Sequence, residues 1–120
     1  MAGTLTISTL SDGTNSTSST NCIQGSAKAW VNFGATGTIN SSYNVSSITY
    51  AATGNYTLNF TTALADANYA YATSCVKDNN NISNGFSLQR LSSGTKSTTQ
   101  LTVQNMANIA GAENSVIIFK

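Results

Sequence analysis

Apolar and polar residues alternate in short stretches along this chain, and clusters of Gly, Asn, Asp and Ser separate the stretches. A period of two residues is typical of a β-strand with one buried face. The clearest stretch is YTLNF at 56–60, where Tyr56, Leu58 and Phe60 alternate with Thr57 and Asn59. Similar patterns predict further strands at 4–10, 27–33, 43–50, 68–76, 85–91, 99–103 and 115–119.

No long window has the period of a helix, so we expect almost no α-helix. Many short strands with Gly- and Asn-rich turns favour an all-β fold, an antiparallel β-sandwich of the jelly-roll-like kind. We expect a single domain over 1–120, with a flexible polar loop at 11–21. The stretch 43–50 should form a hairpin with YTLNF, with a bulge at Ser46-Ser47. The predicted core residues are Val31, Phe33, Tyr56, Leu58, Phe60, Leu88 and Val116.

The stretch AKAWVNF at 27–33 contains the only tryptophan of the chain. Alternation places Val31 and Phe33 on one face with two alanines, and Lys28, Trp30 and Asn32 on the other. The first face is typical of a packed core. Trp30 is therefore expected to point away from the core, towards a ligand or towards another subunit.

The composition narrows the classes of partner. Charged residues make up 8% of the chain and the formal net charge is +1, so neither nucleic acid nor a membrane surface is indicated. An apolar content of 40% argues against disorder. No run approaches the roughly 20 apolar residues of a membrane span, so we expect no membrane insertion.

The residues that usually perform catalysis are scarce. Histidine is absent, and the four carboxylates, Asp12, Asp66, Asp78 and Glu113, are scattered along the sequence. We therefore expect no enzymatic activity, no metal and no cofactor. Cys22 and Cys75 form no CxxC motif, and either two reduced thiols or a disulfide fits their spacing.

Binding is better supported than catalysis. Sugar sites combine an aromatic face with amide and carboxylate groups, because a pyranose offers both C–H faces and hydroxyl edges. The loop Asp78, Asn79, Asn80 and Asn81 supplies such groups, and Tyr50 and Tyr43 could stack on a sugar. A surface turn held by its own Asn side chains, and edge tyrosines packed on their own sheet, remain the structural alternatives.

Four motifs occur in order along the first part of the chain. They are GSAKAWVNF at 25–33, SYNVSSIT at 42–49, TGNYTLNF at 53–60 and ANYA at 67–70. In this order they resemble the C-terminal domain of bacteriophage tail fibres, notably those of marine and cyanobacterial viruses. The resemblance covers roughly residues 3–76, and Asn55 stands where the family usually has Asp.

The resemblance implies the tip domain of a tail fibre, a homotrimer attached to the remainder of the fibre. Such a tip would recognise a host surface glycan such as lipopolysaccharide, or an outer-membrane protein. It would belong to the virion and be made in the host cytoplasm. Three-fold assembly would place Trp30 at a subunit contact. Two alternatives are a purely structural virion module (a fibre cap or trimerisation unit) and a secreted bacterial adhesin domain.

Overall fold

The computed structural model describes residues 2–76, 88–90, 92–105 and 113–120. Within these residues it contains one short helix and ten strands. The N-terminal part holds β1 (Thr9–Ser11), β2 (Ser16–Ser18) and α1 (Ser19–Gly25). The remaining strands are β3 (Ala27–Gly34), β4 (Ile39–Tyr43), β5 (Val45–Ala52), β6 (Asn55–Phe60), β7 (Ala70–Val76), β8 (Leu88–Gln89), β9 (Gln100–Asn105) and β10 (Glu113–Phe119).

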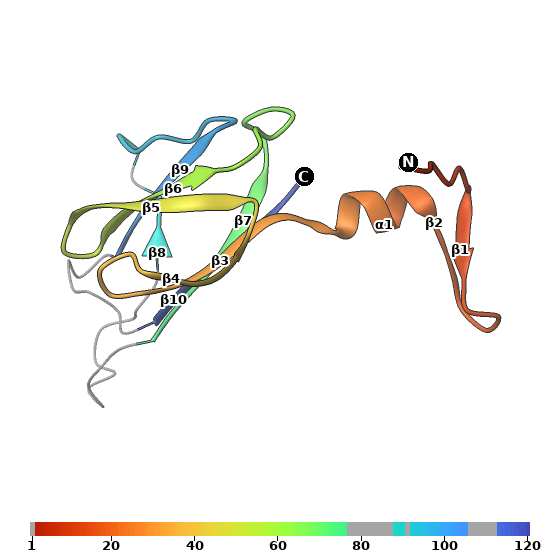
Figure 1. Ribbon diagram of the computed structural model, residues 1–120, viewed down its shortest axis with the longest axis horizontal. Helices are drawn as coiled ribbons and strands as arrows, with labels where there is room; N and C mark the ends of the chain where they lie inside the picture. Colours follow the sequence, from red (N-terminus) through yellow and green to blue (C-terminus); the bar gives the residue numbers. More distant parts are fainter. Residues whose placement is uncertain (1, 77–87, 91, 106–112) are drawn as a thin grey trace.

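Two four-stranded sheets form the body of the protein (Figure 1). The first has the strand order β4-β3-β10-β7 and the second the order β5-β6-β9-β8. Every strand pairing is antiparallel, and β1 and β2 pair separately as a small hairpin. The predicted all-β class is confirmed, whereas the jelly-roll-like β-sandwich and the homotrimer stay predictions.

Residues from both sheets form one hydrophobic core. The first sheet contributes side chains such as Val31, Phe33 and Val116, and the second contributes Tyr56 and Leu58. The Phe33 and Tyr56 rings meet edge to face with centroids 4.9 Å apart, a favourable aromatic geometry. All seven core residues predicted from the sequence are buried.

The hairpin of β5 and β6 follows the sequence pattern closely. β6 alternates half-buried and buried residues along its whole length. The register of β5 shifts between Val45 and Ser47, which confirms the bulge predicted at Ser46-Ser47. Gly54 turns the chain between the two strands with φ of 74°, a left-handed conformation that glycine adopts without steric cost.

The N-terminal prediction was wrong in detail. Only Thr9–Ser11 forms a strand in the stretch predicted at 4–10, and the predicted loop at 11–21 includes β2 and the start of α1. Local side-chain bonds explain the difference. Asp12 Oδ1 accepts from the backbone N–H groups of Thr14 and Asn15 and closes a hairpin turn. The Ser18 side chain then accepts from the N–H of Asn21 and caps α1.

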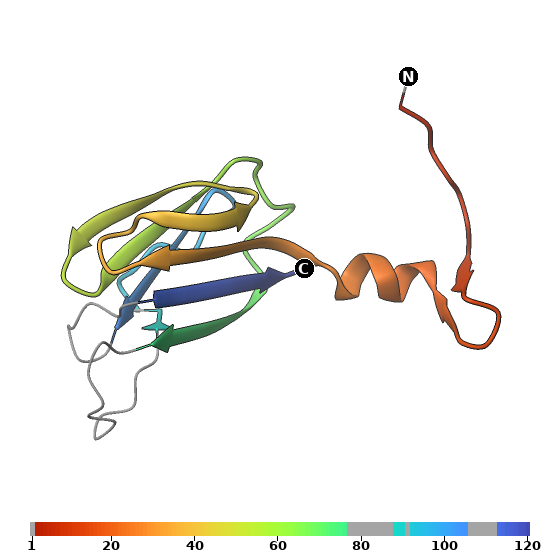
Figure 2. The ribbon, with the colours of Figure 1, turned by 60° about the horizontal axis from the view of Figure 1, so that its bottom comes forward.

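Residues 2–26 extend away from the sheets as an arm, which is the red-to-orange part of the ribbon in Figures 1 and 2. Lys28 holds the base of this arm, because its Nζ donates to Ile23 O and to Ser26 Oγ. A cation at the last turn of α1 complements the carbonyl end of the helix. No helix among the described residues is long and apolar enough to cross a membrane.

Leu58→Ala tests the core assignment. Leu58 is fully buried in β6, so its truncation should lower the free energy of unfolding by about 2–5 kcal/mol. Ile117→Ala is the matched control. Ile117 in β10 is 40% exposed, so its truncation should lower the free energy of unfolding by clearly less. Urea unfolding of both variants at one protein concentration gives the comparison. Equal losses would contradict the assignment of the buried face.

Candidate functional site

A row of apolar side chains crosses the outer face of the first sheet. Trp30 in β3 pairs directly with Tyr43 in β4 on one side and with Ile117 in β10 on the other. Directly opposed residues in antiparallel strands lie on the same face, with Cβ atoms about 4.5–5.5 Å apart. Trp30 is half-buried, while Val31 and Phe33 are buried in the core, so the predicted division of faces in AKAWVNF is confirmed.

A hydrogen-bond network centred on Asn32 lies on the same face, beside the aromatic row. Asn32 follows Trp30 by two residues, and its Nδ2 donates to Glu113 Oε1 at 2.8 Å and to Ser115 Oγ at 3.0 Å. Asn40 Nδ2 in turn donates to Asn32 Oδ1 at 2.8 Å. These bonds hold the amide of Asn32 in one orientation beside the aromatic row.

Tyr43 connects this row to a shallow polar hollow. The hollow is lined by Tyr43, Asn44, Thr61 and Thr62, with a volume of about 380 Å³. Tyr43 is 58% exposed, more than the other tyrosine with a large exposed surface, Tyr50 at 41%. The accessible ring of Tyr43 therefore lies between Trp30 and the hollow that Thr61 and Thr62 line.

Asn44 is the residue that sets this geometry. It joins β4 of the first sheet to β5 of the second and has φ of 55°, in the left-handed region that non-glycine residues seldom occupy. Its Nδ2 donates to Lys28 O and to Thr62 O, each at 3.1 Å, and its Oδ1 accepts from the N–H of Thr62 at 2.7 Å. Asn44 thus ties β3, the crossing between sheets and the threonine side of the hollow together.

The structure does not gather the residues predicted to bind a ligand. Asp78, Asn79, Asn80 and Asn81 lie outside the described residues. Tyr50 lies in β5 of the second sheet and is not among the residues that line the hollow at Tyr43. The ring centroids of Tyr50 and Tyr56 are 5.7 Å apart, and the two residues are directly opposite each other in the pairing of β5 with β6. Packing of Tyr50 on its own sheet is the simpler interpretation of this contact.

Burial and ion pairing shift the pKa values of several titratable groups in the body. Burial raises the pKa of Tyr69 to about 12 and also raises the pKa of the Cys75 thiol, so both stay protonated at neutral pH. A side-chain hydrogen bond from Lys120 lowers the pKa of Asp66. The two residues form an ion pair, with Lys120 Nζ 2.7 Å from Asp66 Oδ2. No activated nucleophile or base emerges from this set.

Cysteines and metal ligands were the other candidates for chemistry. Both cysteines are free: Cys75 is half-buried in β7, whereas Cys22 is exposed in α1. Among the described residues, no three of the His, Cys, Asp and Glu type lie close enough to hold a metal ion. The outer face around Tyr43 offers an exposed aromatic ring beside threonine hydroxyl groups, and such groups can stack and form hydrogen bonds.

The sequence named Tyr43 and Trp30 and placed Asn32 on the face of Trp30, but it did not reveal the other polar neighbours of Tyr43. Asn32 follows Trp30 by two residues in β3, so alternation within the strand was enough to place it. Asn44, Thr61 and Thr62 come together only because β4 and β5 belong to different sheets. A lone Asn between two strands was the available signal, since Asn tolerates the left-handed conformation better than most residues.

Asn44→Ala should destabilise the protein by about 1–3 kcal/mol, because it removes three hydrogen bonds and leaves a residue with a Cβ at positive φ. Asn44→Gly is the matched control. Glycine adopts the backbone conformation freely, so it should lose less stability than alanine and still fall below the wild type. Chemical denaturation measures both variants. An alanine variant as stable as the wild type would show that the Asn44 bonds contribute nothing.

Comparisons with known proteins add no relative. No protein-family model, no curated protein and no solved structure matches this chain. The likeness to tail-fibre domains therefore stands on the four motifs in the sequence.

Proposed function

We propose that this chain is a non-enzymatic recognition domain of a bacteriophage tail fibre that binds a glycan of the host cell surface. The support from the sequence is the ordered set of four motifs that resembles tail-fibre tips. The observation in the structure that carries the proposal is the exposed Tyr43 ring, placed between Trp30 and the threonine-lined hollow. A virion location and attachment to the remainder of the fibre follow from the same proposal.

The chemistry of this surface matches that of a sugar. An aromatic ring offers its face to the C–H groups of a pyranose, while the hydroxyl edges of the sugar need donors and acceptors. Around Tyr43 these are the hydroxyl groups of Thr61 and Thr62, which line the hollow. None of these groups is charged, so a neutral saccharide fits better than a phosphate or a basic peptide.

A second arrangement has its own support and places another subunit on the aromatic row. Beyond Trp30 the outer face continues with Ile117, 40% exposed, and Phe119, 37% exposed. Exposed aliphatic and aromatic groups side by side are typical of contacts between proteins. This is the homotrimer with Trp30 at a subunit contact, and it corresponds to the structural virion module as an alternative function.

Tyr43→Ala separates ligand binding from folding. Loss of one stacking ring should weaken glycan binding roughly tenfold, which corresponds to about 1.4 kcal/mol. The measurement is binding of labelled protein to an array that includes bacterial lipopolysaccharides, followed by titration of any hit. Tyr50→Ala is the control, since Tyr50 lies in the other sheet and should leave affinity unchanged. If the Tyr50 variant lost binding and the Tyr43 variant kept it, the site would lie elsewhere.

Trp30→Ala distinguishes the two arrangements of the outer face. If the row binds glycan, the variant loses binding and keeps the mass of the wild type in light scattering. If the row is a subunit contact, the variant falls towards the 12.4 kDa of a single chain. We expect the loss of binding to dominate, because Trp30 neighbours the exposed Tyr43 directly.

The loop predicted from the sequence is tested separately. Replacing Asn79, Asn80 and Asn81 together by alanine should weaken binding to host cells and leave the melting temperature nearly unchanged, because a polar loop adds little to a core. Adsorption of the labelled variant to cells gives the answer. Unaltered adsorption would remove this loop from the recognition surface and leave Tyr43 as the candidate.

A further inference from the structure

The arm of residues 2–26 exposes apolar side chains without a partner in the body. Leu5 is 81% exposed, Ile23 64%, Leu10 52% and Ile7 39%. Ser, Thr and Asn make up 50 of the 120 residues, so the chain is rich in small polar residues. Four large aliphatic groups on one short arm form a patch that the composition of the protein does not explain.

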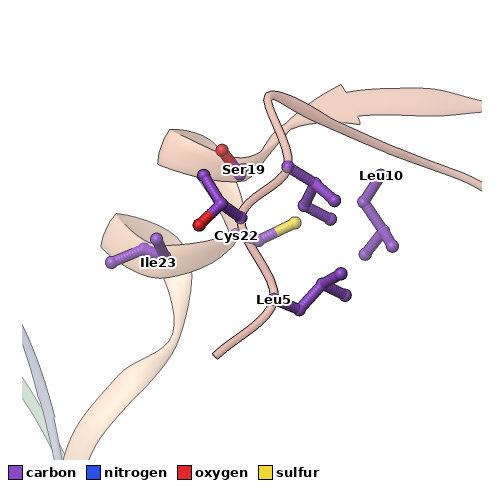
Figure 3. Close-up of a pocket in the computed structure, with 7 residues that line it drawn as sticks. Leu5, Leu10, Ser19, Cys22 and Ile23 are labelled. Atoms are coloured by element: carbon purple, nitrogen blue, oxygen red, sulfur yellow. The ribbon is translucent and has the colours of Figure 1, made fainter. Parts of the chain in front are cut away.

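These side chains converge instead of being scattered. Leu5, Ile7 and Leu10 line one pocket together with Cys22 and Ile23 of α1 (Figure 3). The pocket has a volume of about 370 Å³ and opens to solvent on the arm itself. Its lining is mainly aliphatic, which is the lining that an aliphatic side chain from elsewhere fills well.

The arm has too few internal contacts to hold its shape alone. β1 and β2 have three residues each, and an isolated two-stranded hairpin is marginal in water. α1 has seven residues, none of them buried, whereas isolated helices shorter than about 12–15 residues are marginal even with favourable sequences. Capping by Ser18 and Lys28 fixes the ends of α1 but buries no apolar surface.

We propose that the arm of a second copy of this chain covers the pocket, so that the arm is an assembly element. Three observations select this occupant. Asp12 is the only charged residue within 2–26, so each arm carries a single charge and little like-charge repulsion opposes contact between copies. A stretch of this length matches the roughly 20–30 residues that each partner supplies to a stable interface.

The third observation concerns the competing occupant, a lipid surface. Helices that lie on membranes carry Lys and Arg on their polar face. Residues 2–26 contain neither, and Lys28 at the base of the arm already donates to Ile23 O and Ser26 Oγ. Aliphatic groups without flanking cations fit the arm of another copy better than they fit a lipid surface.

The inference goes beyond the proposed glycan recognition and does not depend on it. It places assembly on the arm and leaves the outer face around Tyr43 free for a ligand. Several copies held together at their arms would carry several binding surfaces, which raises the effective affinity for a repetitive cell surface without any new contact.

The test uses the full chain with Leu5, Ile7, Leu10 and Ile23 all changed to Ser. Sedimentation of the wild type from low to high micromolar concentration should give at least twice the 12.4 kDa of one chain, and the four-serine variant should fall to the single-chain mass. Val76→Ser is the control, since Val76 is 53% exposed on the body, and it should keep the wild-type mass. A monomeric wild type, or a four-serine variant with the wild-type mass, would overturn the proposal.

Labelling of Cys22 provides a second readout that needs no loss of structure. Cys22 is exposed and lines the pocket, so arm association should slow its reaction with a maleimide severalfold as the wild-type concentration rises. Cys22→Ser supplies the background from Cys75. A rate independent of concentration would also overturn the proposal. Binding of the four-serine variant to the glycan array is measured in a separate experiment. A failure of the glycan proposal therefore does not change how the assembly and labelling results are interpreted.

Discussion

Between β4 and β5 the chain crosses from the first sheet to the second through a single residue, Asn44, and the arrangement of the outer face depends on that crossing. The residue before it, Tyr43, ends β4 and is exposed, while the residue after it, Val45, begins β5 and is buried in the core. With only one residue available, the backbone must take the left-handed conformation, and the Asn side chain makes the bonds that a longer loop would make with its own backbone. Asn44 therefore determines both which side chains of β5 point into the core and how far the Tyr43 ring is exposed.

Alternation within a strand was enough to predict which side chains are buried. In β3 and β6 the period of two residues assigned Val31, Phe33, Leu58 and their neighbours to the core, because a strand with one buried face has no other register available. The same pattern at 4–10 misled, since alternation gives a strand only where a neighbouring strand pairs with it along its length. β2 pairs with only two residues of that stretch, Thr9 and Leu10, and the polar turn at Asp12 ends the ladder.

The candidate site could be predicted only in part, for a related reason. Trp30 and Asn32 share a face within one strand, so local alternation places them correctly. Tyr43 meets Trp30 only through the pairing of β3 with β4, and Thr61 and Thr62 reach the hollow only through Asn44. Neighbours that depend on a strand pairing or on a crossing between sheets leave no periodic signal in the sequence. The N-terminal pocket has the same origin, because it needs both the stretch 5–10 and α1.

The shortage of charge gives these surfaces a common physical character. One ion pair, between Lys120 and Asp66, occurs among the described residues, and the outer face is ordered mainly by amides and hydroxyls. Uncharged hydrogen bonds are hardly screened by salt, but each contributes little net free energy. A single surface of this kind would bind a saccharide weakly across a wide range of ionic strength. Joining several copies through uncharged, aliphatic arms would raise the overall affinity while leaving that tolerance of salt intact, because neither contact relies on charge.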